Sequence, residues 1–229
     1  MNERYSRQTM LPEIGEAGQE RLRRARVLIV GVGGLGSPVS LYLTAAGVGC
    51  LGLVDDDVVS VSNLQRQVLY TEAEVGAPKV ECARRRLSEL NSTTRIETYP
   101  TRFTAENAAE LVANYDLVVD GCDNAATRYL IDEECARQGK PYVYGSIAAF
   151  EGQVSVFNYR GGPRYSDLYP RPAVMPAPQP GGVVGSIPGL IGCLQASEAI
   201  KIIAGCGEVL SGKLYWTNLL TLQHEIIEL

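Results

Sequence analysis

Short apolar runs alternate with longer amphipathic stretches along most of the chain. Val27–Val30 contains only valine, leucine and isoleucine, which is typical of a parallel strand buried on both faces. A glycine-rich stretch and a helical pattern to about Ala46 follow it, and Cys50–Val54 is predicted to be a second strand. The first 57 residues therefore predict one βαβ unit.

The alternation continues downstream of this unit. Helices are predicted from Pro78, over Ala105–Ala113 and over about Asn124–Gln138, and strands over Arg95–Tyr99, Asp116–Asp120 and Pro141–Gly145. This order predicts an α/β fold with a mostly parallel sheet covered by helices on both faces. Adjacent strands follow at Gln153–Asn158, Lys213–Trp216 and Leu219–Ile226, and they predict an antiparallel extension in the C-terminal part.

Two segments outside the alternation are also expected to be helical. Met1–Ala25 is charged, and Gly15 and Gly18 are expected to break its helical pattern. Val183–Ala204 is apolar, but a proline and two charged residues interrupt it. We therefore expect a buried helix there rather than a membrane span.

The stretch Gly161–Gly182 holds half of the twelve prolines. Because proline fixes φ and removes a backbone donor, this stretch is predicted to be a long crossover loop, neither helix nor central strand. The chain is expected to be one domain over 1–229, with a nucleotide-binding core over 26–145 and a C-terminal part over 151–229 that includes the loop.

Composition narrows the class of protein. The net charge of -5 argues against a nucleic-acid-binding surface. Without an apolar leader or an apolar run long enough to span a bilayer, no membrane partner is expected, and the scattered cysteines predict a cytoplasmic protein. The six cysteines are scattered without metal-ligand spacing, so reduced and mostly buried thiols are expected. The single histidine, His224, is predicted to be a surface strand residue.

The strongest chemical signal is the loop that follows the first strand. Gly31, Gly33, Gly34 and Gly36 lie between a strand and a helix, where glycine lets the backbone turn tightly and approach a nucleotide. Asp55 ends the second strand nineteen residues beyond Gly36, at the spacing of a carboxylate that binds ribose hydroxyls. These features predict a Rossmann-like nucleotide site, and alone they would favour a nicotinamide or flavin enzyme.

A second group of polar residues points to a triphosphate instead. Asn63, Arg66 and Gln67 follow Asp57 closely, and Lys79 stands at the start of the next helix. The helix dipole disfavours a cation there, so we interpret Lys79 and Arg66 as ligands of an anion. The alternative is that both are solvated surface cations.

Asp123 and Asn124 lie where a strand of the predicted sheet ends and a helix begins. Either side chain could simply cap that helix. With a triphosphate nearby, Asp123 is also a candidate ligand of Mg²⁺, which proteins commonly hold by one or two carboxylates together with phosphates.

Taken together, these strings resemble the ThiF/MoeB/HesA family, the bacterial relatives of ubiquitin-activating enzymes. The matching segments run from Arg4 to about Glu228 and include RYSRQ, RVLIVGVGGLGSP, AGVG, DDDVVSVSNLQRQ, VGAPKVE, DGCDN, EGQVSVF and PGLIGCLQASEAIK. The ordered set SNLQRQ, APKVE and D-x-x-D-N is the specific part of the resemblance.

The resemblance implies an ATP- and Mg²⁺-dependent adenylyltransferase that activates the C-terminal Gly-Gly carboxylate of a ubiquitin-fold sulfur carrier, in thiamine thiazole or molybdopterin synthesis. It implies that Asp55 binds ribose and that Asn63, Arg66 and Lys79 bind phosphates. Asp123 would hold Mg²⁺, and Arg7 would reach the nucleotide of the other subunit of a homodimer. Catalysis would need no histidine, because a terminal carboxylate is already ionised at neutral pH.

The chain departs from the family pattern at several positions. Many relatives bind zinc through two C-x-x-C pairs, but Arg164 and Asp167 stand at the first pair and the second would lie beyond Leu229, so zinc is not expected. The crossover-loop cysteine of some relatives falls near Pro178, which implies a separate sulfur donor. A covalent step at Cys193 is disfavoured by its apolar helix.

Three alternatives remain open from the sequence. They are adenylation of another peptide or small-molecule carboxylate, a nicotinamide-dependent oxidoreductase, and a catalytically silent partner subunit. The oxidoreductase hypothesis explains the glycine loop and Asp55, but it gives no role to Arg66, Lys79 and Asp123.

Overall fold

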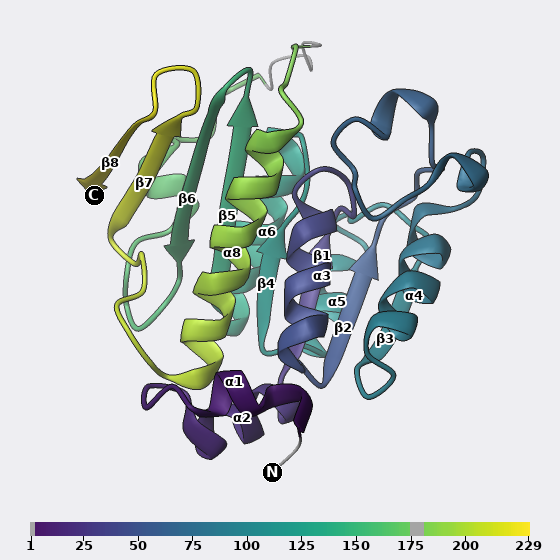
Figure 1. Cartoon of the computed structure of the whole chain (residues 1–229). Helices are drawn as coiled ribbons and strands as arrows, with labels where there is room; N and C mark the ends of the chain where they lie inside the picture. The colour runs from purple at the N-terminus through teal and green to yellow at the C-terminus, as the bar shows by residue number, and fades with distance from the viewer. Residues whose placement is uncertain (1–2, 175–180) are drawn as a thin grey trace.

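Eight strands form one sheet in the computed structural model, which describes residues 3–174 and 181–229 (Figure 1). The sheet order is β3-β2-β1-β4-β5-β6-β7-β8. The strands are β1 (Arg26–Val30), β2 (Cys50–Val54), β3 (Arg95–Tyr99), β4 (Leu117–Asp120), β5 (Tyr142–Ala148), β6 (Glu151–Phe157), β7 (Lys213–Asn218) and β8 (Gln223–Glu228). The first five pair in parallel and β5 to β8 pair antiparallel, which confirms the predicted fold class.

Helices cover both faces of the sheet (Figure 1). The longer ones are α2 (Gly15–Arg24), α3 (Gly36–Ala46), α4 (Lys79–Leu90), α5 (Ala108–Ala113), α6 (Ala125–Gln138) and α8 (Ser186–Ala204). The short ones are η1 (Glu3–Tyr5), α1 (Ser6–Thr9), η2 (Val61–Asn63), η3 (Glu72–Glu74) and α7 (Tyr165–Leu168). Apolar residues of α3, α4 and the C-terminal half of α8 share one core cluster, and those of α5 and α6 belong to a second. Ile187 and Ile191 of α8 belong to a small third cluster.

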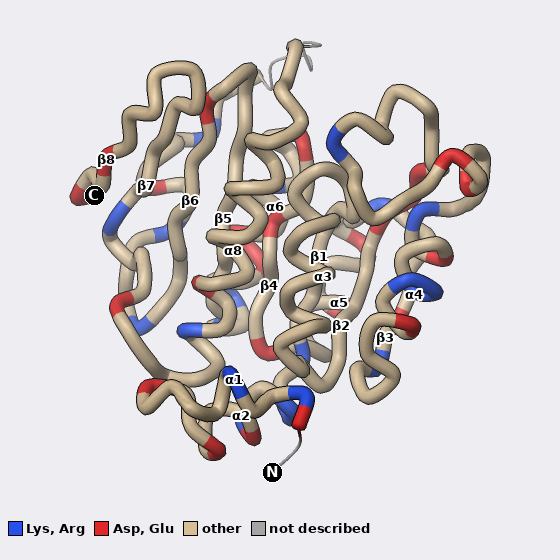
Figure 2. The backbone as a smooth tube through the Cα atoms, viewed as in Figure 1, with Lys and Arg blue, Asp and Glu red and all other residues tan. Residues whose placement is uncertain are grey.

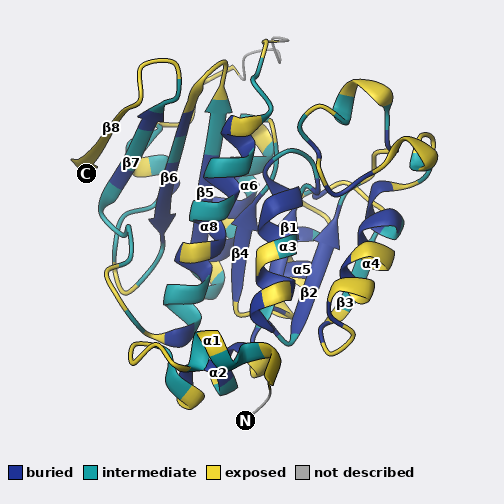
Figure 3. Cartoon of the chain, in the orientation of Figure 1, coloured by how far each residue is buried: buried dark blue, intermediate teal, exposed yellow. Residues whose placement is uncertain are grey.

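Alternate residues of the central strands enter the two cores. Val27 and Ile29 of β1 pack into the cluster under α3 and α8, and Leu28 and Val30 pack into the cluster under α5 and α6. Because both faces are covered, β1, β2 and β4 are buried along almost their whole length (Figure 3). This explains why the strands read as continuous apolar runs.

Helix α8 is long and apolar enough to cross a membrane by length and composition alone. Half of its most apolar window is buried inside the protein, where it packs against α3, β5 and β6. A methyl group on Gly192 would lie 2.4 Å from Pro38 of α3, so the two helices approach closely. The predicted buried helix is therefore confirmed as a core helix.

Two expectations for the N-terminal and central helices need correction. The N-terminal break lies at residues 10–14, and Gly18 is a buried residue inside α2 that faces Ala204 of α8. The predicted helix over Ala105–Ala113 begins at Ala108, because the Asn107 side chain binds the backbone of the preceding turn.

Two expectations for the C-terminal part were also wrong. Residues 219–222 form the hairpin turn before β8, with Leu222 at a φ of 58°, so the last strand begins at Gln223. The stretch Gly161–Gly182 contains the short helix α7. Asp167 caps α7 through the N–H of Arg164 at 2.8 Å, a local signal that the high proline content obscured. Pro176, Pro178 and Pro180 lie outside the described residues.

Candidate functional site

The candidate site lies where the strand order of the sheet reverses. From β1 the chain passes through α3 on one face to β2, whereas from β4 it passes through α6 on the other face to β5. The loops after β1 and β4 are therefore neighbours at the carboxyl edge of the sheet (Figure 1). Open α/β sheets bind ligands in the crevice at such a switch point.

The glycine loop after β1 leaves no room for side chains at its two ends. Gly31 has a φ of 90°, and a Cβ there would lie 2.6 Å from the carbonyl oxygen of Gly121. A Cβ on Gly36 would lie 2.1 Å from the carbonyl oxygen of Gly31, and one on Gly121 would meet the same oxygen at 2.1 Å. The loops after β1 and β4 are thus in backbone contact, and glycine is required at both.

Gly36→Ala is expected to destabilise the protein by roughly 1–3 kcal/mol, because the added methyl group overlaps a backbone oxygen that cannot move away freely. Gly189→Ala is the matched control, since a Cβ in that first turn of α8 meets nothing within 4 Å. It should be neutral or stabilise by up to about 1 kcal/mol. Urea unfolding of both variants measures the difference, and equal stabilities would contradict the proposed overlap.

Asp55 joins β2 to the glycine loop. One of its carboxylate oxygens accepts the N–H of Val32 at 2.8 Å, and the other accepts the N–H of Asp57 at 2.9 Å. Burial raises the pKa of the Asp55 carboxyl, and these two N–H groups act against that rise. The buried hydroxyl of Tyr70 donates to the carbonyl of Val32 at 2.7 Å. Asp55 therefore stands beside the glycine loop, as predicted.

Lys79 is the first residue of α4, but it is not a solvated surface cation. Its side chain is 5% exposed, and its ammonium donates to Asp57 at 2.9 Å. The Asp57 side chain is 66% exposed and also faces water. A buried ammonium at the positive end of a helix, paired with one solvated carboxylate, favours binding of a further anion.

Asn63 is the last residue of η2, and Arg66 and Gln67 lie on the loop that follows it. The carbonyl of Asn63 accepts the N–H groups of Arg66 and Gln67 at 3.0 and 2.9 Å, so one turn holds all three. The aliphatic part of Arg66 lies near Gly34, and the amide of Gln67 lies beside Gly33. Gln67 is buried, and its side-chain oxygen has no hydrogen-bond partner among the described residues. The Gln67 atom nearest to Gly33 is the amide nitrogen, a donor that would suit an anionic ligand.

Asp123 and Asn124 occupy the loop after β4. Asn124 caps α6, because its side-chain oxygen accepts the N–H of Thr127 at 2.9 Å. Asp123 is exposed, and within the described part of the chain its carboxylate accepts one long hydrogen bond, from Asn124 at 3.4 Å. Asn124 thus has the capping role, and Asp123 keeps its oxygens available.

Asp123 also suits Mg²⁺ better than the other acidic group at this edge of the sheet. Carboxylate oxygens of Asp55, Asp56 and Asp57 lie within 4.8 Å of one another. However, Asp55 binds two backbone N–H groups, Asp56 pairs with Arg102 at 2.7 Å, and Asp57 pairs with Lys79. Among the described residues at this edge, Asp123 is the carboxylate that neither pairs with a cation nor accepts a backbone N–H, which fits a ligand that Mg²⁺ would share with phosphates.

Arg7 lies at the opposite end of the sheet. It is an exposed residue of α1, and the neighbouring Gln8 binds the carbonyl of Ala46 at the C-terminal end of α3 (Figure 1). The N-terminus is held there by Tyr5, whose ring lies against Gly47. Within one chain, Arg7 is therefore not brought to the glycine loop.

A buried network under the loop after β4 was missed by sequence reasoning. Asp120 is completely buried and binds Arg128 at 3.0 Å and the Tyr142 hydroxyl at 3.0 Å. Asp120 is the first aspartate of the D-x-x-D-N string, which was the available signal. Tyr70 lacks any such pattern, because its partner is a backbone carbonyl.

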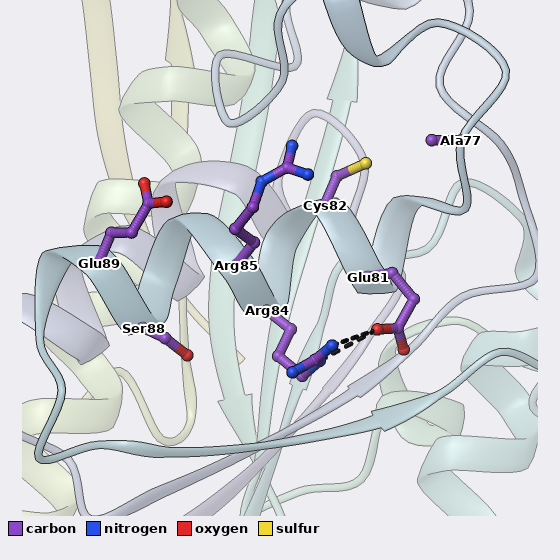
Figure 4. A pocket seen from close by; sticks show the side chains of 7 residues that line it. All are labelled: Ala77, Glu81, Cys82, Arg84, Arg85, Ser88 and Glu89. Carbon is purple, nitrogen blue, oxygen red and sulfur yellow. Dashed lines mark hydrogen bonds and ion pairs between the residues drawn. The ribbon is translucent and has the colours of Figure 1, made fainter.

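Two hollows on the described surface lie away from this site. One of about 550 Å³ runs along α4 (Figure 4). The charges around it are neutralised locally, since Arg84 pairs with Glu81 at 2.8 Å and Arg85 pairs with Glu74. Figure 2 shows acidic and basic residues interspersed along this helix. A mixed, self-paired surface is a poorer nucleotide site than the switch point, with its buried ammonium and free polar groups.

The fold and this site are those of a Rossmann-like α/β protein whose polar residues at the switch point suit a phosphate chain. The ThiF family model matches residues 5–229, and the chain belongs to the ThiF family. It is 50% identical over 220 residues to a sulfur carrier protein adenylyltransferase of Thermus thermophilus, covering 93% of this chain and 81% of that protein.

Other relatives are longer than this chain. A probable molybdopterin-synthase adenylyltransferase of Porphyra purpurea is 45% identical over 226 residues, which are 97% of this chain and 59% of that protein. An adenylyltransferase and sulfurtransferase of Mus musculus is 49% identical over 217 residues, which are 92% of this chain and 46% of that protein. The chain thus spans about half of the length of several relatives.

Solved structures share the fold. A crystal structure of PaaA superposes with a TM-score of 0.86 at 24% identity, covering 99% of this chain and 72% of that chain. E. coli MccB with ATP superposes with a TM-score of 0.84 at 23% identity, covering 100% of this chain and 72% of that chain.

Proposed function

We propose that this protein is an ATP- and Mg²⁺-dependent adenylyltransferase that activates the C-terminal Gly-Gly carboxylate of a ubiquitin-fold sulfur carrier, in thiamine thiazole or molybdopterin synthesis. The observation that carries the proposal is the convergence of the glycine loop, Asp55, the buried Lys79 and the uncommitted Asp123 at one switch point. The named adenylyltransferases at 45–50% identity support this assignment.

The proposed reaction is nucleotidyl transfer without a protein base. The terminal carboxylate is ionised at neutral pH and attacks the α-phosphorus of ATP. One carboxylate–phosphorus bond forms, the bond from the α-phosphorus to the bridging oxygen breaks, and pyrophosphate leaves with that oxygen. His224, an exposed residue of β8, has no part in this scheme.

Charge neutralisation and positioning carry the catalysis. Lys79 and Arg66 would bind phosphate oxygens, and the amide of Gln67 and the N–H groups at the start of α3 would orient them. Asp123 would hold Mg²⁺, which neutralises phosphate charge when it is bound. Asp55, fixed by two N–H groups, would accept from the ribose hydroxyls.

The cysteines favour a reaction that stops at the acyl-adenylate. All six are free; Cys50, Cys82 and Cys135 are buried and the other three are partly exposed. Burial raises the pKa of Cys50 to about 11, and it raises the pKa of Cys193 as well. Protonated thiols are poor nucleophiles, so we infer a separate sulfur donor. We also propose that the protein has no structural zinc, because Arg164 and Asp167 stand at the positions of the first C-x-x-C pair.

The product of a single turnover tests the proposal. Protein, MgATP and a candidate carrier ending in Gly-Gly are expected to yield the carrier linked to AMP, together with pyrophosphate, both detected by mass spectrometry. The same carrier without its last glycine is the control. AMP transfer that ignores this deletion would contradict activation of the Gly-Gly carboxylate.

We further propose a homodimer in which Arg7 serves the nucleotide of the partner. This role accounts for the position of α1, the helix that carries Arg7, at the end of the sheet opposite the glycine loop of its own chain. Arg7→Ala and Asp123→Ala should each be inactive alone. When the two variants are mixed in equal amounts and exchange subunits, about half of the dimers contain one subunit of each. Each such dimer has one intact site of two, so the mixture should recover about a quarter of the wild-type activity. No recovery in dimers shown to have exchanged subunits would contradict this role.

A further inference from the structure

The loop after β4 is held by the buried carboxylate of Asp120, and both oxygens of this carboxylate accept hydrogen bonds. Asp120 is 0% exposed, and one of its oxygens accepts the backbone N–H and the thiol of Cys122, both at 2.9 Å. The other oxygen accepts Nε of Arg128 at 3.0 Å and the hydroxyl of Tyr142 at 3.0 Å. A buried carboxylate requires such partners, so its position is closely defined.

Arg128 lies on α6, and its side chain extends back to the loop after β4. Its side chain is 13% exposed, and one terminal nitrogen donates to the carbonyl of Cys122 at 3.1 Å and to that of Gly145 in β5 at 3.3 Å. Its guanidinium lies over the ring of Tyr144, 5.5 Å from the centroid. The planar, multidentate guanidinium thus ties the loop to α6, β4 and β5 at once, which the single ammonium of a lysine does not reproduce.

These contacts surround Asp123 without using its carboxylate. The preceding peptide is held by Asp120 and Arg128, and the following residue, Asn124, is fixed as the cap of α6. On the other side, the N–H of Gly121 donates to the carbonyl of Val30 at 2.8 Å, which sets the loop against the end of β1. The backbone of Asp123 is therefore fixed relative to the glycine loop while its oxygens stay free.

We propose that Arg128, through the Asp120 carboxylate and the carbonyl of Cys122, is the positioning residue that aims Asp123 at the nucleotide. This inference rests on the proposed function for the identity of the ligand. Some residues do not touch a metal but orient its ligand through hydrogen bonds. Replacing such a residue typically lowers metal affinity or activity about 10–100-fold.

Arg128→Lys tests the role with the charge retained. Its affinity for MgATP, measured by calorimetry, should fall about tenfold, and the Mg²⁺ concentration for half-maximal activity should rise. Arg26→Lys is the matched control, because Arg26 also binds a carboxylate, Glu97 at 2.9 Å, a carbonyl and the face of Tyr115, but at the amino end of the sheet. If Arg128 acts only through general stability, the two variants will show the same MgATP affinity.

A double-variant cycle asks whether Arg128 acts through Asp123. In the Asp123→Ala background, Arg128→Lys should cause no further loss of MgATP affinity, because there is no carboxylate left to aim. A full tenfold additional loss would overturn the inference. Tyr142→Phe removes one hydrogen bond to Asp120 without removing a charge, and it should weaken MgATP binding in the same direction if Arg128→Lys fails to fold.

Amide hydrogen exchange separates this inference from the proposed function, since it needs no ligand. In Arg128→Lys the peptide that contains Cys122 should lose protection, while the same peptide in Arg26→Lys should match the wild type. Unchanged protection would overturn the positioning role. If protection is lost in Arg128→Lys but the wild-type protein does not bind MgATP, the proposed function would be overturned. The Arg128 contacts would then hold the loop but have no role in catalysis.

Discussion

Asp123→Ala is expected to lower ATP–pyrophosphate exchange by about 10²–10³-fold or more and to leave the fold intact. The carboxylate is exposed and accepts one hydrogen bond, at 3.4 Å from Asn124, so its loss should change the free energy of unfolding by no more than about 0.5 kcal/mol. The surrounding backbone is held by other residues. Exchange kinetics and thermal unfolding of the same preparation check both halves of the prediction.

Glu89→Ala provides the control for removing one exposed acidic residue. Glu89 lies on the solvent face of α4, beside the hollow in Figure 4, and is remote from the switch point. Its removal should leave exchange and stability unchanged. Normal turnover by Asp123→Ala would remove Asp123 from the mechanism, and a large loss of stability would show that the carboxylate has a structural role.

Lys79→Ala is expected to reduce exchange by about 10²–10³-fold, since it removes the buried cation at the site. The cost in stability should be modest. Asp57 stays solvated without its partner, and removing a cation from the first turn of α4 returns a few tenths of a kcal/mol to offset the lost burial of the lysine stem.

Lys201→Ala is the matched lysine control. Lys201 pairs with Glu198 within α8, outside the candidate site, so exchange should persist in this variant. The ATP affinity of Lys79→Ala, measured by calorimetry, locates the effect. Wild-type affinity and wild-type exchange in that variant would show that Lys79 is only a partner of Asp57.

The parallel sheet and the glycine loop could be predicted because local pattern determines them. Val27–Val30 is apolar throughout since it is buried on both faces, and Gly31 and Gly36 are needed where two backbone loops touch. The gathering of Asp55 and Asp123 at one edge also follows from strand order, because parallel strands place their carboxyl ends together.

What the sequence did not reveal depends on tertiary contacts. The Asp120–Arg128 pair joins a strand end to a helix, and Tyr70 supports the glycine loop through a carbonyl, for which no residue pattern exists. The burial of Lys79 was likewise invisible, because a lysine at a helix start is compatible with solvent exposure. The start of β8 was misplaced since alternation continues through the turn at 219–222.

ATP–pyrophosphate exchange in the presence of Mg²⁺, with and without a Gly-Gly-terminated carrier, tests the central claim most directly. The proposed function predicts exchange that requires both Mg²⁺ and the intact carrier terminus, because the acyl-adenylate forms reversibly. Measurable ATP binding without exchange for any carrier would mean that another carboxylate is the substrate. No ATP binding at all would contradict the assignment of the site.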